Sequence, residues 1–205
     1  MIPAFNVSGV LPPFTGETSV DPAGTSPYRT SIVEVVRRYC TSEARREILS
    51  GLLAYRARLR AVGIVNGFQW LDGSFVENVE IVRSRPPKDI DLVTFAYRPV
   101  QDINDWLRFL DEHQELFDSI RTSEMYKVDA YYVDLNIRPD LVVANTTYWH
   151  GLFSHQRETA LWKGMLQVPI SNDDDGARVI LDQQDVQAGI TDEVTTGAGG
   201  HAETA

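Results

Sequence analysis

The sequence predicts an α/β fold of the α+β kind, in which a small mixed β-sheet is covered by helices on one face. Two observations lead to this expectation. Stretches with apolar residues at helical spacing alternate along the chain with short runs rich in β-branched and aromatic residues. The chain has 205 residues, of which 43% are hydrophobic, so it is long enough to enclose one core. We expect the folded body to span residues 32–171.

The two ends of the chain differ in composition from this body. Residues 1–31 are rich in Pro, Gly, Ser and Thr, which predicts an irregular N-terminal arm. The arm carries five apolar residues that can hold it against the body: Ile2, Phe5, Val10, Leu11 and Phe14. Residues 172–205 supply −7 of the net charge of −10 and predict a largely disordered acidic tail, with at most a short element at 178–181.

The helices and strands of the body follow from the spacing of apolar residues. A helix is expected over 43–61, because Thr41 or Ser42 can cap its start and Gly63 can end it. The strands are expected where Val, Ile, Phe and Tyr gather between turn residues. The other elements, in chain order, are a strand over 64–72, a short helix over 75–81, a strand over 89–97, a helix over 102–117, a strand over 127–137, a partly helical segment over 145–162 and a strand over 163–170.

Composition excludes several classes of protein. The net charge of −10 argues against a general nucleic-acid binder, which would carry a basic face. No apolar run has the roughly 18 residues of a membrane span, and the N-terminus lacks the pattern of a signal peptide. Cys40 is the only cysteine, so an intramolecular disulfide and a cysteine-based zinc cluster are excluded. We expect a cytoplasmic protein with no membrane partner.

The most informative motif is a pair of carboxylates on a predicted strand. Asp89 and Asp91 flank Ile90, and side chains alternate along a strand, so both carboxylates point to one face while Ile90 points to the other. Two carboxylates on one face repel each other unless a cation, a proton or an arginine offsets their charge. The pattern therefore predicts a cradle for a divalent metal ion.

A Gly-Ser pair precedes these carboxylates by fourteen residues. Gly73 allows the backbone to approach a phosphate closely, and Ser74 adds a hydroxyl donor. The free N–H groups at the start of the following helix favour an anion. A third carboxylate on an adjacent strand would complete the metal site, and the candidates are Asp129 and Asp134. They lie five residues apart, hence on opposite faces of a regular strand, and we prefer Asp129 because it comes early in its strand.

These residues resemble the signature of the polymerase-β-like nucleotidyltransferase superfamily. That signature is a Gly-Ser pair, a spacer, an Asp-x-Asp strand and a third acidic residue on a neighbouring strand, and it covers roughly residues 43–138 here. The spacer of fourteen residues is at the long end of the family pattern. Within the superfamily the chain is similar to small stand-alone bacterial members, related to the minimal nucleotidyltransferases of toxin–antitoxin and phage-defence loci. The motifs that carry this closer likeness are Leu11-Pro12-Pro13 and Trp162-Lys163-Gly164.

The resemblance implies a metal-dependent transfer of a nucleoside monophosphate from a nucleoside triphosphate (NTP) to a hydroxyl of a protein or an RNA. Asp89, Asp91 and Asp129 are then the catalytic residues and the ligands of Mg²⁺ or Mn²⁺, with Asp134 as the alternative third ligand. The nucleotide is expected to contact Gly73, Ser74 and Lys163.

Two other functions are compatible with the same residues. One is a binding module that keeps the nucleotidyltransferase fold with weak catalysis and acts through a partner protein, as an antitoxin or as a subunit of a defence complex. The other is a metal-dependent nuclease, which needs a lysine or a further acidic residue close to the acidic pair. Lys88 adjoins Asp89, but it should point away from it on the strand.

Two further sets of residues admit plainer interpretations. Arg83, Arg85 and Lys88 belong to a basic loop that can contact phosphates, although a solvated loop is the simpler interpretation. His150 and His155 lie five residues apart, which matches neither one helix face nor a common zinc pattern, so we expect them to be structural.

Overall fold

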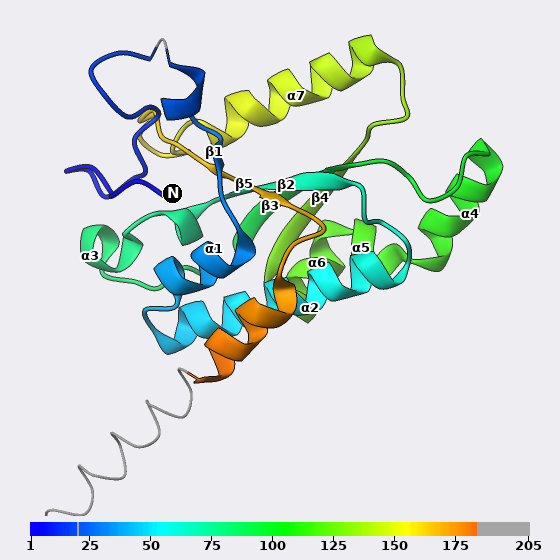
Figure 1. The fold of residues 1–205 in the computed structure, drawn as a ribbon, viewed down its shortest axis with the longest axis horizontal. Helices are drawn as coiled ribbons and strands as arrows, with labels where there is room; N and C mark the ends of the chain where they lie inside the picture. Colours follow the sequence, from blue (N-terminus) through cyan, green and yellow to red (C-terminus); the bar gives the residue numbers. More distant parts are fainter. Residues whose placement is uncertain (20, 184–205) are drawn as a thin grey trace, which may run out of the picture.

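A computed structural model describes residues 1–19 and 21–183 and shows a five-stranded mixed sheet between helices (Figure 1). The strands are β1 (Tyr28–Arg29), β2 (Gly67–Asp72), β3 (Ile90–Ala96), β4 (Val128–Asp134) and β5 (Leu166–Pro169). The helices are η1 (Pro22–Gly24), α1 (Ile32–Tyr39), α2 (Glu43–Ala61), η2 (Ser74–Val76), α3 (Val79–Arg83), α4 (Ile103–Glu112), α5 (Gln114–Phe117), α6 (Ser119–Tyr126) and α7 (Pro139–Phe153). A further helix covers residues 174–183. The predicted α+β class is confirmed.

The strands lie in the order β1-β5-β2-β3-β4. β2 is antiparallel to both of its neighbours, β5 and β3, whereas the outer pairs β1–β5 and β3–β4 are parallel. The parallel β3–β4 pair requires a crossover, and α4, α5 and α6 supply it. The sheet is therefore mixed, as predicted.

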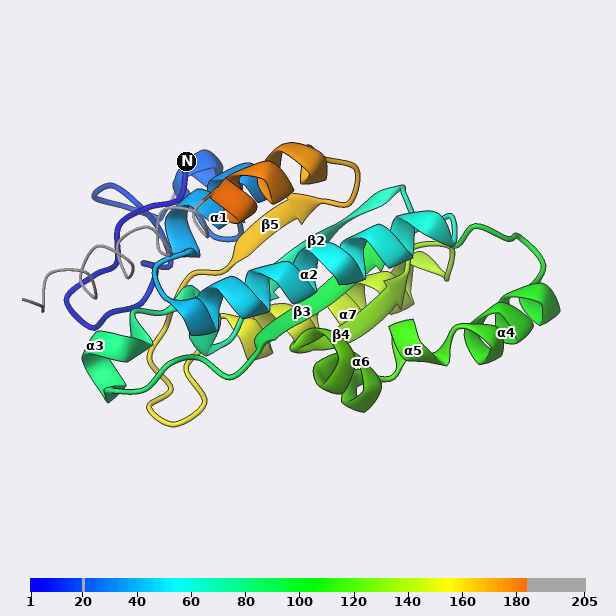
Figure 2. The same ribbon diagram turned by 90° about the horizontal axis from the view of Figure 1, so that it is seen from below.

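The two faces of the sheet carry separate apolar clusters. On one face Leu71, Ile90 and Leu92 pack with α1, α2 and the C-terminal helix. On the other face Trp70, Val93 and Phe95 pack against Trp149 and Phe153 of α7. Figure 2 shows α2 and α7 on opposite sides of the strands. The expectation of helices on one face thus needs a correction, because α7 covers the second face.

The helix over 43–61 has the predicted bounds, and Ser42 accepts a hydrogen bond from the backbone N–H of Arg45 as its cap. The predicted helix over 102–117 is two helices, α4 and α5, because His113 leaves the helical conformation. Of the residues on the apolar side of α4, Trp106 is buried, but Ile103 and Leu107 are more than half exposed. The sequence patterns missed α1 and α6 altogether.

The acidic tail was expected to begin at residue 172, and the structure moves this boundary. Residues 174–183 are helical, and Ala177 and Leu181 are buried in the cluster that also contains α2. Arg178 donates a hydrogen bond to the hydroxyl of Ser50 on α2. The prediction failed because the charge of the segment hides two apolar residues at helical spacing. The rest of the predicted tail, residues 184–205, lies outside the described residues.

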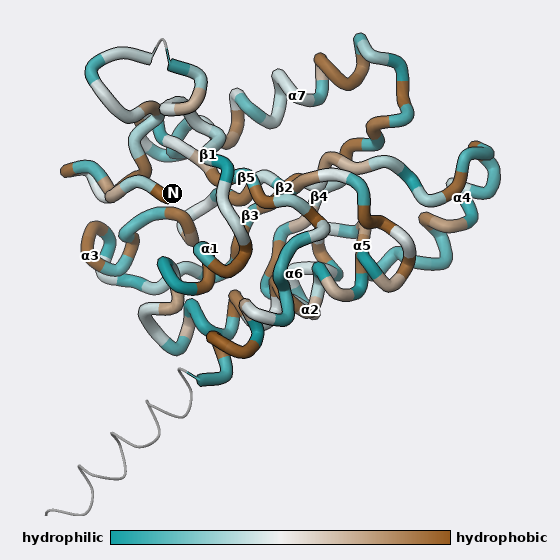
Figure 3. The backbone as a smooth tube through the Cα atoms, viewed as in Figure 1, coloured by the Kyte–Doolittle hydropathy of each residue, from teal (hydrophilic) through white to brown (hydrophobic). Residues whose placement is uncertain are grey.

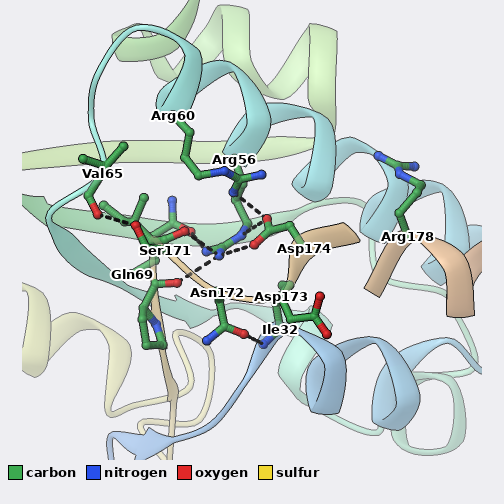
Figure 4. Close-up of polar contacts among 12 residues, drawn as sticks. Ile32, Arg56, Arg60, Val65, Gln69, Ser171, Asn172, Asp173, Asp174 and Arg178 are labelled. Carbon is green, nitrogen blue, oxygen red and sulfur yellow. Dashed lines mark hydrogen bonds and ion pairs between the residues drawn. The ribbon is translucent and has the colours of Figure 1, made fainter. Parts of the chain in front are cut away.

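A buried arginine holds the C-terminal helix against α2 and the sheet (Figure 4). Arg56 is fully buried and donates two hydrogen bonds to the carboxylate of Asp174, at 2.8 and 2.9 Å. Its other N–H groups reach Oε1 of Gln69 and the carbonyls of Pro169 and Ile170. Arg60 adds a second cation 2.7 Å from Asp174. The guanidinium thus joins three segments that are far apart in the sequence.

No helix among residues 1–19 and 21–183 is long and apolar enough to span a membrane.

We expect Asp174→Asn to lower the free energy of unfolding by about 3 kcal/mol, because it leaves the buried guanidinium of Arg56 without its counter-charge. Urea denaturation measures this change. The matched control is Asp140→Asn, which breaks an exposed, solvent-screened ion pair with Arg138 and should leave stability nearly unchanged. Equal losses in the two variants would contradict a structural role for the Arg56 cluster.

Candidate active site

Three aspartates stand side by side on three adjacent strands. Asp72 at the end of β2 is paired with Asp91 on β3, and Asp91 is paired with Asp129 on β4. Residues two positions apart on a strand share a face. Asp72 lies two positions after Trp70, and Asp91 two positions before Val93, and both apolar residues pack on the α7 side of the sheet. All three carboxylates therefore lie on the face that α7 covers. Neighbouring strands are about 4.8 Å apart, which makes this a compact row of acidic side chains. We call Asp72, Asp91 and Asp129 the carboxylate row.

The register also separates the two candidates for the third carboxylate. Asp129 lies at the start of β4 beside Asp91, whereas Asp134 lies at the opposite end of the strand, paired with Ala96. The carboxylate of Asp134 is 3.8 Å from the guanidinium of Arg98, away from the row. Asp89 precedes β3 on the same face as Asp91. The structure therefore brings Asp89, Asp91 and Asp129 together and leaves Asp134 outside.

Gly73 makes the turn that follows β2, and its conformation depends on the absence of a side chain. Its φ angle is +79°, and a Cβ built on it would lie 1.8 Å from Oδ2 of Asp91. The backbone of Gly73 is therefore packed directly against the central carboxylate of the row. This contact explains in physical terms why a glycine stands at this point of the motif.

A pocket of about 610 Å³ opens over the carboxylate row. Its floor consists of the row, Asp89, Gly73 and Ser74, and its walls come from the last turn of α7 and the segment after it. Arg83, Arg85 and Arg157 lie at the pocket as well. The pocket thus combines an acidic floor with arginines, an arrangement suited to a ligand that carries both phosphates and a metal ion.

Ser74 lines the pocket, but the helix expected after it is different. η2 is a single turn of three residues, and α3 begins only at Val79. The argument that a helix N-terminus attracts a phosphate at Ser74 is therefore wrong, because so short a turn aligns too few peptide dipoles. The features that could still contact a phosphate here are the hydroxyl of Ser74 and the turn at Gly73.

Lys163 lines the pocket, but it is almost fully buried and its ammonium is paired with acidic side chains. Only 2% of its surface is exposed, and its Nζ lies 2.9 Å from Oδ1 of Asp72 and 3.1 Å from Oε1 of Glu77. Gln156 donates a further hydrogen bond to Glu77. Burial lowers the pKa of Lys163, but the charges of Asp72 and Glu77 outweigh it and the net pKa is raised. The ammonium is therefore the internal counter-charge of Asp72, and a contact with a nucleotide stays a prediction.

The acidic side chains of the row are held in an unfavourable state at neutral pH. Burial, together with the charges of Asp89 and Asp129, raises the pKa of Asp91 to about 6. Burial likewise raises the pKa of Asp72 to about 7 in spite of Lys163. The pKa of Asp129 is raised by burial and by Asp89. A cation over the row would relieve this repulsion.

The donors fit a hard divalent cation in their chemistry, since carboxylate oxygens are the preferred ligands of Mg²⁺ and Mn²⁺. In residues 1–19 and 21–183, however, no three His, Cys, Asp or Glu side chains already surround a common point. Asp89, Asp91 and Asp129 border one pocket, but their carboxylates do not converge on a shared point in this structure. The residues therefore fit a divalent cation in the chemistry of their donors and in their position around one pocket.

Sequence reasoning did not single out several residues that line the pocket, among them Asp72 and Arg157. A signal existed for Asp72, because it follows Trp70 by two positions and directly precedes the Gly-Ser pair. None existed for Arg157, which reaches the pocket from the segment after α7. His155 also lines the pocket, with its Nδ1 3.0 Å from the hydroxyl of Ser154, while His150 packs on the edge of Trp70.

The raised pKa values predict that the free energy of unfolding of the metal-free protein falls as the pH rises from about 4 to 7. In that window the folded chain retains protons that the unfolded chain has released, so stability decreases with pH. Asp91→Asn removes one of these groups. It should therefore stabilise the protein at pH 7.5 by on the order of 1 kcal/mol and leave it nearly unchanged at pH 4.

Urea denaturation in EDTA at both pH values measures this effect. Asp140→Asn serves as the control, because its exposed carboxylate lies beside Arg138 and its pKa is lowered, so its loss should bring no gain at pH 7.5. A loss of stability in Asp91→Asn at pH 7.5 would contradict the repulsion that we describe.

Comparison with known proteins identifies the family of the chain and no closer relative. Neither the curated proteins nor the solved structures contain a match. A family of unknown function, DUF6932, matches residues 3–169, a range that includes every residue lining the pocket. Because this match covers most of the chain, the protein belongs to the DUF6932 family of unknown function.

Proposed function

We propose that the protein is a metal-dependent nucleotidyltransferase that moves a nucleoside monophosphate from an NTP to a hydroxyl of a protein or an RNA. One observation carries the proposal: Asp91 and Asp129 are in register on adjacent strands, Asp89 lies beside them, and the Gly73 turn packs on Asp91 within the same pocket. This is the arrangement that the resemblance to the polymerase-β-like superfamily implies. A toxin–antitoxin or phage-defence setting is part of the proposal and rests on that resemblance alone.

Each group in the pocket has a distinct part in such a transfer. Asp89, Asp91 and Asp129 would hold Mg²⁺ or Mn²⁺, which supplies charge neutralisation and polarises the α-phosphate when bound. The Gly73 turn and Ser74 lie where the phosphates would enter. Arg83, Arg85 and Arg157 add positive charge around the pocket, which favours a polyphosphate over a neutral ligand.

Lys163 acts through Asp72 in this proposal. Asp72 is the member of the row closest to the Gly73 turn, and its charge would repel a triphosphate. The ammonium of Lys163, 2.9 Å away, offsets that charge and also lies 3.4 Å from the carbonyl of Gly73. Lys163 is thus a positioning residue that supports the turn and neutralises its acidic neighbour.

A binding module with weak catalysis is the alternative, and the outer surface of α7 favours it. Leu141, Val143 and Tyr148 on this helix are between 44% and 64% exposed. Figure 3 shows an apolar stretch near the N-terminal end of α7, where the helix extends away from the sheet. Exposed apolar side chains on one helix are typical of a surface that contacts a partner protein.

The proposal predicts that the protein transfers label from an NTP labelled at the α-phosphate to a component of a cell extract, in the presence of Mg²⁺ or Mn²⁺. Asp91→Asn should reduce transfer about 100-fold or more, since it removes the central charge of the row. Asp134→Asn is the matched control on the same sheet and should keep full transfer, because Asp134 lies away from the pocket.

A second measurement is independent of turnover. Mg²⁺ with an NTP should raise the melting temperature of the wild type and of Asp134→Asn, but not that of Asp91→Asn. If no NTP is transferred or bound while a partner protein co-purifies stably with the chain, the binding module is the correct function.

We expect Gly73→Ala to abolish transfer, because its Cβ would occupy the place of Oδ2 of Asp91. Gly16→Ala is the matched control: its φ angle is also positive, at +90°, but no atom lies within 4 Å of the new Cβ. Both variants should lose stability because of the positive φ angle, and Gly73→Ala should lose more because its Cβ also clashes with Asp91. Only Gly73→Ala should lose transfer. Equal transfer activity in the two variants would show that the Gly73 turn is not part of the active site.

A further inference from the structure

The hydroxyl of Tyr131 lies at the far end of the carboxylate row. Tyr131 follows Asp129 by two positions on β4, so both side chains are on the α7 face. Its Oη is 3.4 Å from Oδ2 of Asp129 and donates a hydrogen bond to it. The ring packs on Trp149 of α7, with centroids 4.6 Å apart, which restrains the phenol in this position. The side chain is 36% exposed and lines the pocket.

The order of the row separates the two ends of the pocket. Asp72 and the Gly73 turn belong to β2, and Asp129 belongs to β4 on the other side of β3. If the phosphates lie over the Gly73 turn, the hydroxyl that receives the nucleotide must approach from the side of Asp129. Among the described residues that line the pocket, only Ser74 and Tyr131 carry a hydroxyl, and Ser74 is at the phosphate end.

We propose that Tyr131 is itself an acceptor and that the protein attaches one nucleoside monophosphate to the phenolic oxygen of Tyr131. This inference rests on the proposed function and adds a modification site to it. A nucleotide on Tyr131 would fill the place of any other acceptor hydroxyl, so the modification would limit the activity of the same chain.

The transfer is a balanced substitution at phosphorus. The Oη of Tyr131 attacks the α-phosphorus of the NTP, and its proton passes to the carboxylate of Asp129, which already accepts its hydrogen bond. The new bond joins Oη to the α-phosphorus. The bond from that phosphorus to the oxygen that bridges to the β-phosphate breaks, and pyrophosphate leaves with the electron pair. No oxidant or reductant is involved.

The test uses the full chain with each NTP labelled at the α-phosphate, Mg²⁺ or Mn²⁺, and no added acceptor. Intact mass and peptide mapping should show at most one nucleotide per chain, located on Tyr131. Tyr131→Phe should lose this label, since it removes only the hydroxyl. Tyr132→Phe and Tyr97→Phe should keep it: Tyr132 donates to the carbonyl of Ala96 on the other face, and Tyr97 is exposed beyond the end of β3.

Binding of an NTP analogue with a methylene group between the α- and β-phosphates provides a readout without turnover. The analogue should bind the wild type and Tyr131→Phe equally, which shows that the variant is folded and that the phenol is an acceptor rather than a phosphate ligand. A tenfold or greater loss of analogue binding in Tyr131→Phe would overturn the proposal in favour of a binding role for the phenol.

The remaining outcomes separate this inference from the proposed function. If the wild type transfers label to a cell extract but Tyr131 carries none, or if the label lies on another residue of the chain, Tyr131 is not an acceptor and the nucleotidyltransferase stands. If the analogue does not bind and no label appears on the chain or in the extract, the proposed function fails and this inference fails with it.

Discussion

The in-register pairing of β2, β3 and β4 is the constraint on which the candidate site depends. Side chains alternate between the faces of a strand, so a slip of one residue would turn Asp91 into the core beneath α2 and expose Leu92. Apolar clusters on both faces prevent that slip, because every second residue of β3 is packed on one side or the other. The packing of the neighbouring apolar side chains thus holds the carboxylate row in place, although its aspartates do not attract one another.

The row is electrostatically costly, and the protein offsets only part of that cost. Lys163 neutralises Asp72 from within, whereas Asp91 and Asp129 face the pocket with their mutual repulsion largely intact. A folded chain that retains such repulsion loses stability at neutral pH unless a cation binds. Asp72 is thus paired with an internal lysine, whereas Asp91 and Asp129 are not. The two ends of the pocket differ as a result: the Gly73 turn lies at the Asp72 end, and Tyr131 lies at the Asp129 end.

Elements distant from the pocket hold its frame. α7 covers the second face of the sheet and supplies Trp149, which packs on Tyr131, and the segment after it brings Arg157 and Lys163 to the site. Behind the opposite face, Arg56 ties the C-terminal helix to α2 and to the carbonyls at the end of β5. β5 in turn pairs with β2, the strand that ends at Asp72. Contacts on both faces of the sheet therefore help to fix the position of β2 and, with it, of the carboxylate row.

The sequence by itself determined the local features: α2 with its cap, the strand that carries Asp91, and the mixed α/β class, because periodicity and capping act over a few residues. The sequence also favoured Asp129 over Asp134 as the third carboxylate of the site, because Asp129 comes early in its strand. Only the tertiary structure decided that Asp72 joins the row, that Lys163 is buried against it, that α7 takes the second face and that residues 174–183 fold. These depend on contacts between segments up to 118 residues apart, and no local pattern records which segments become neighbours.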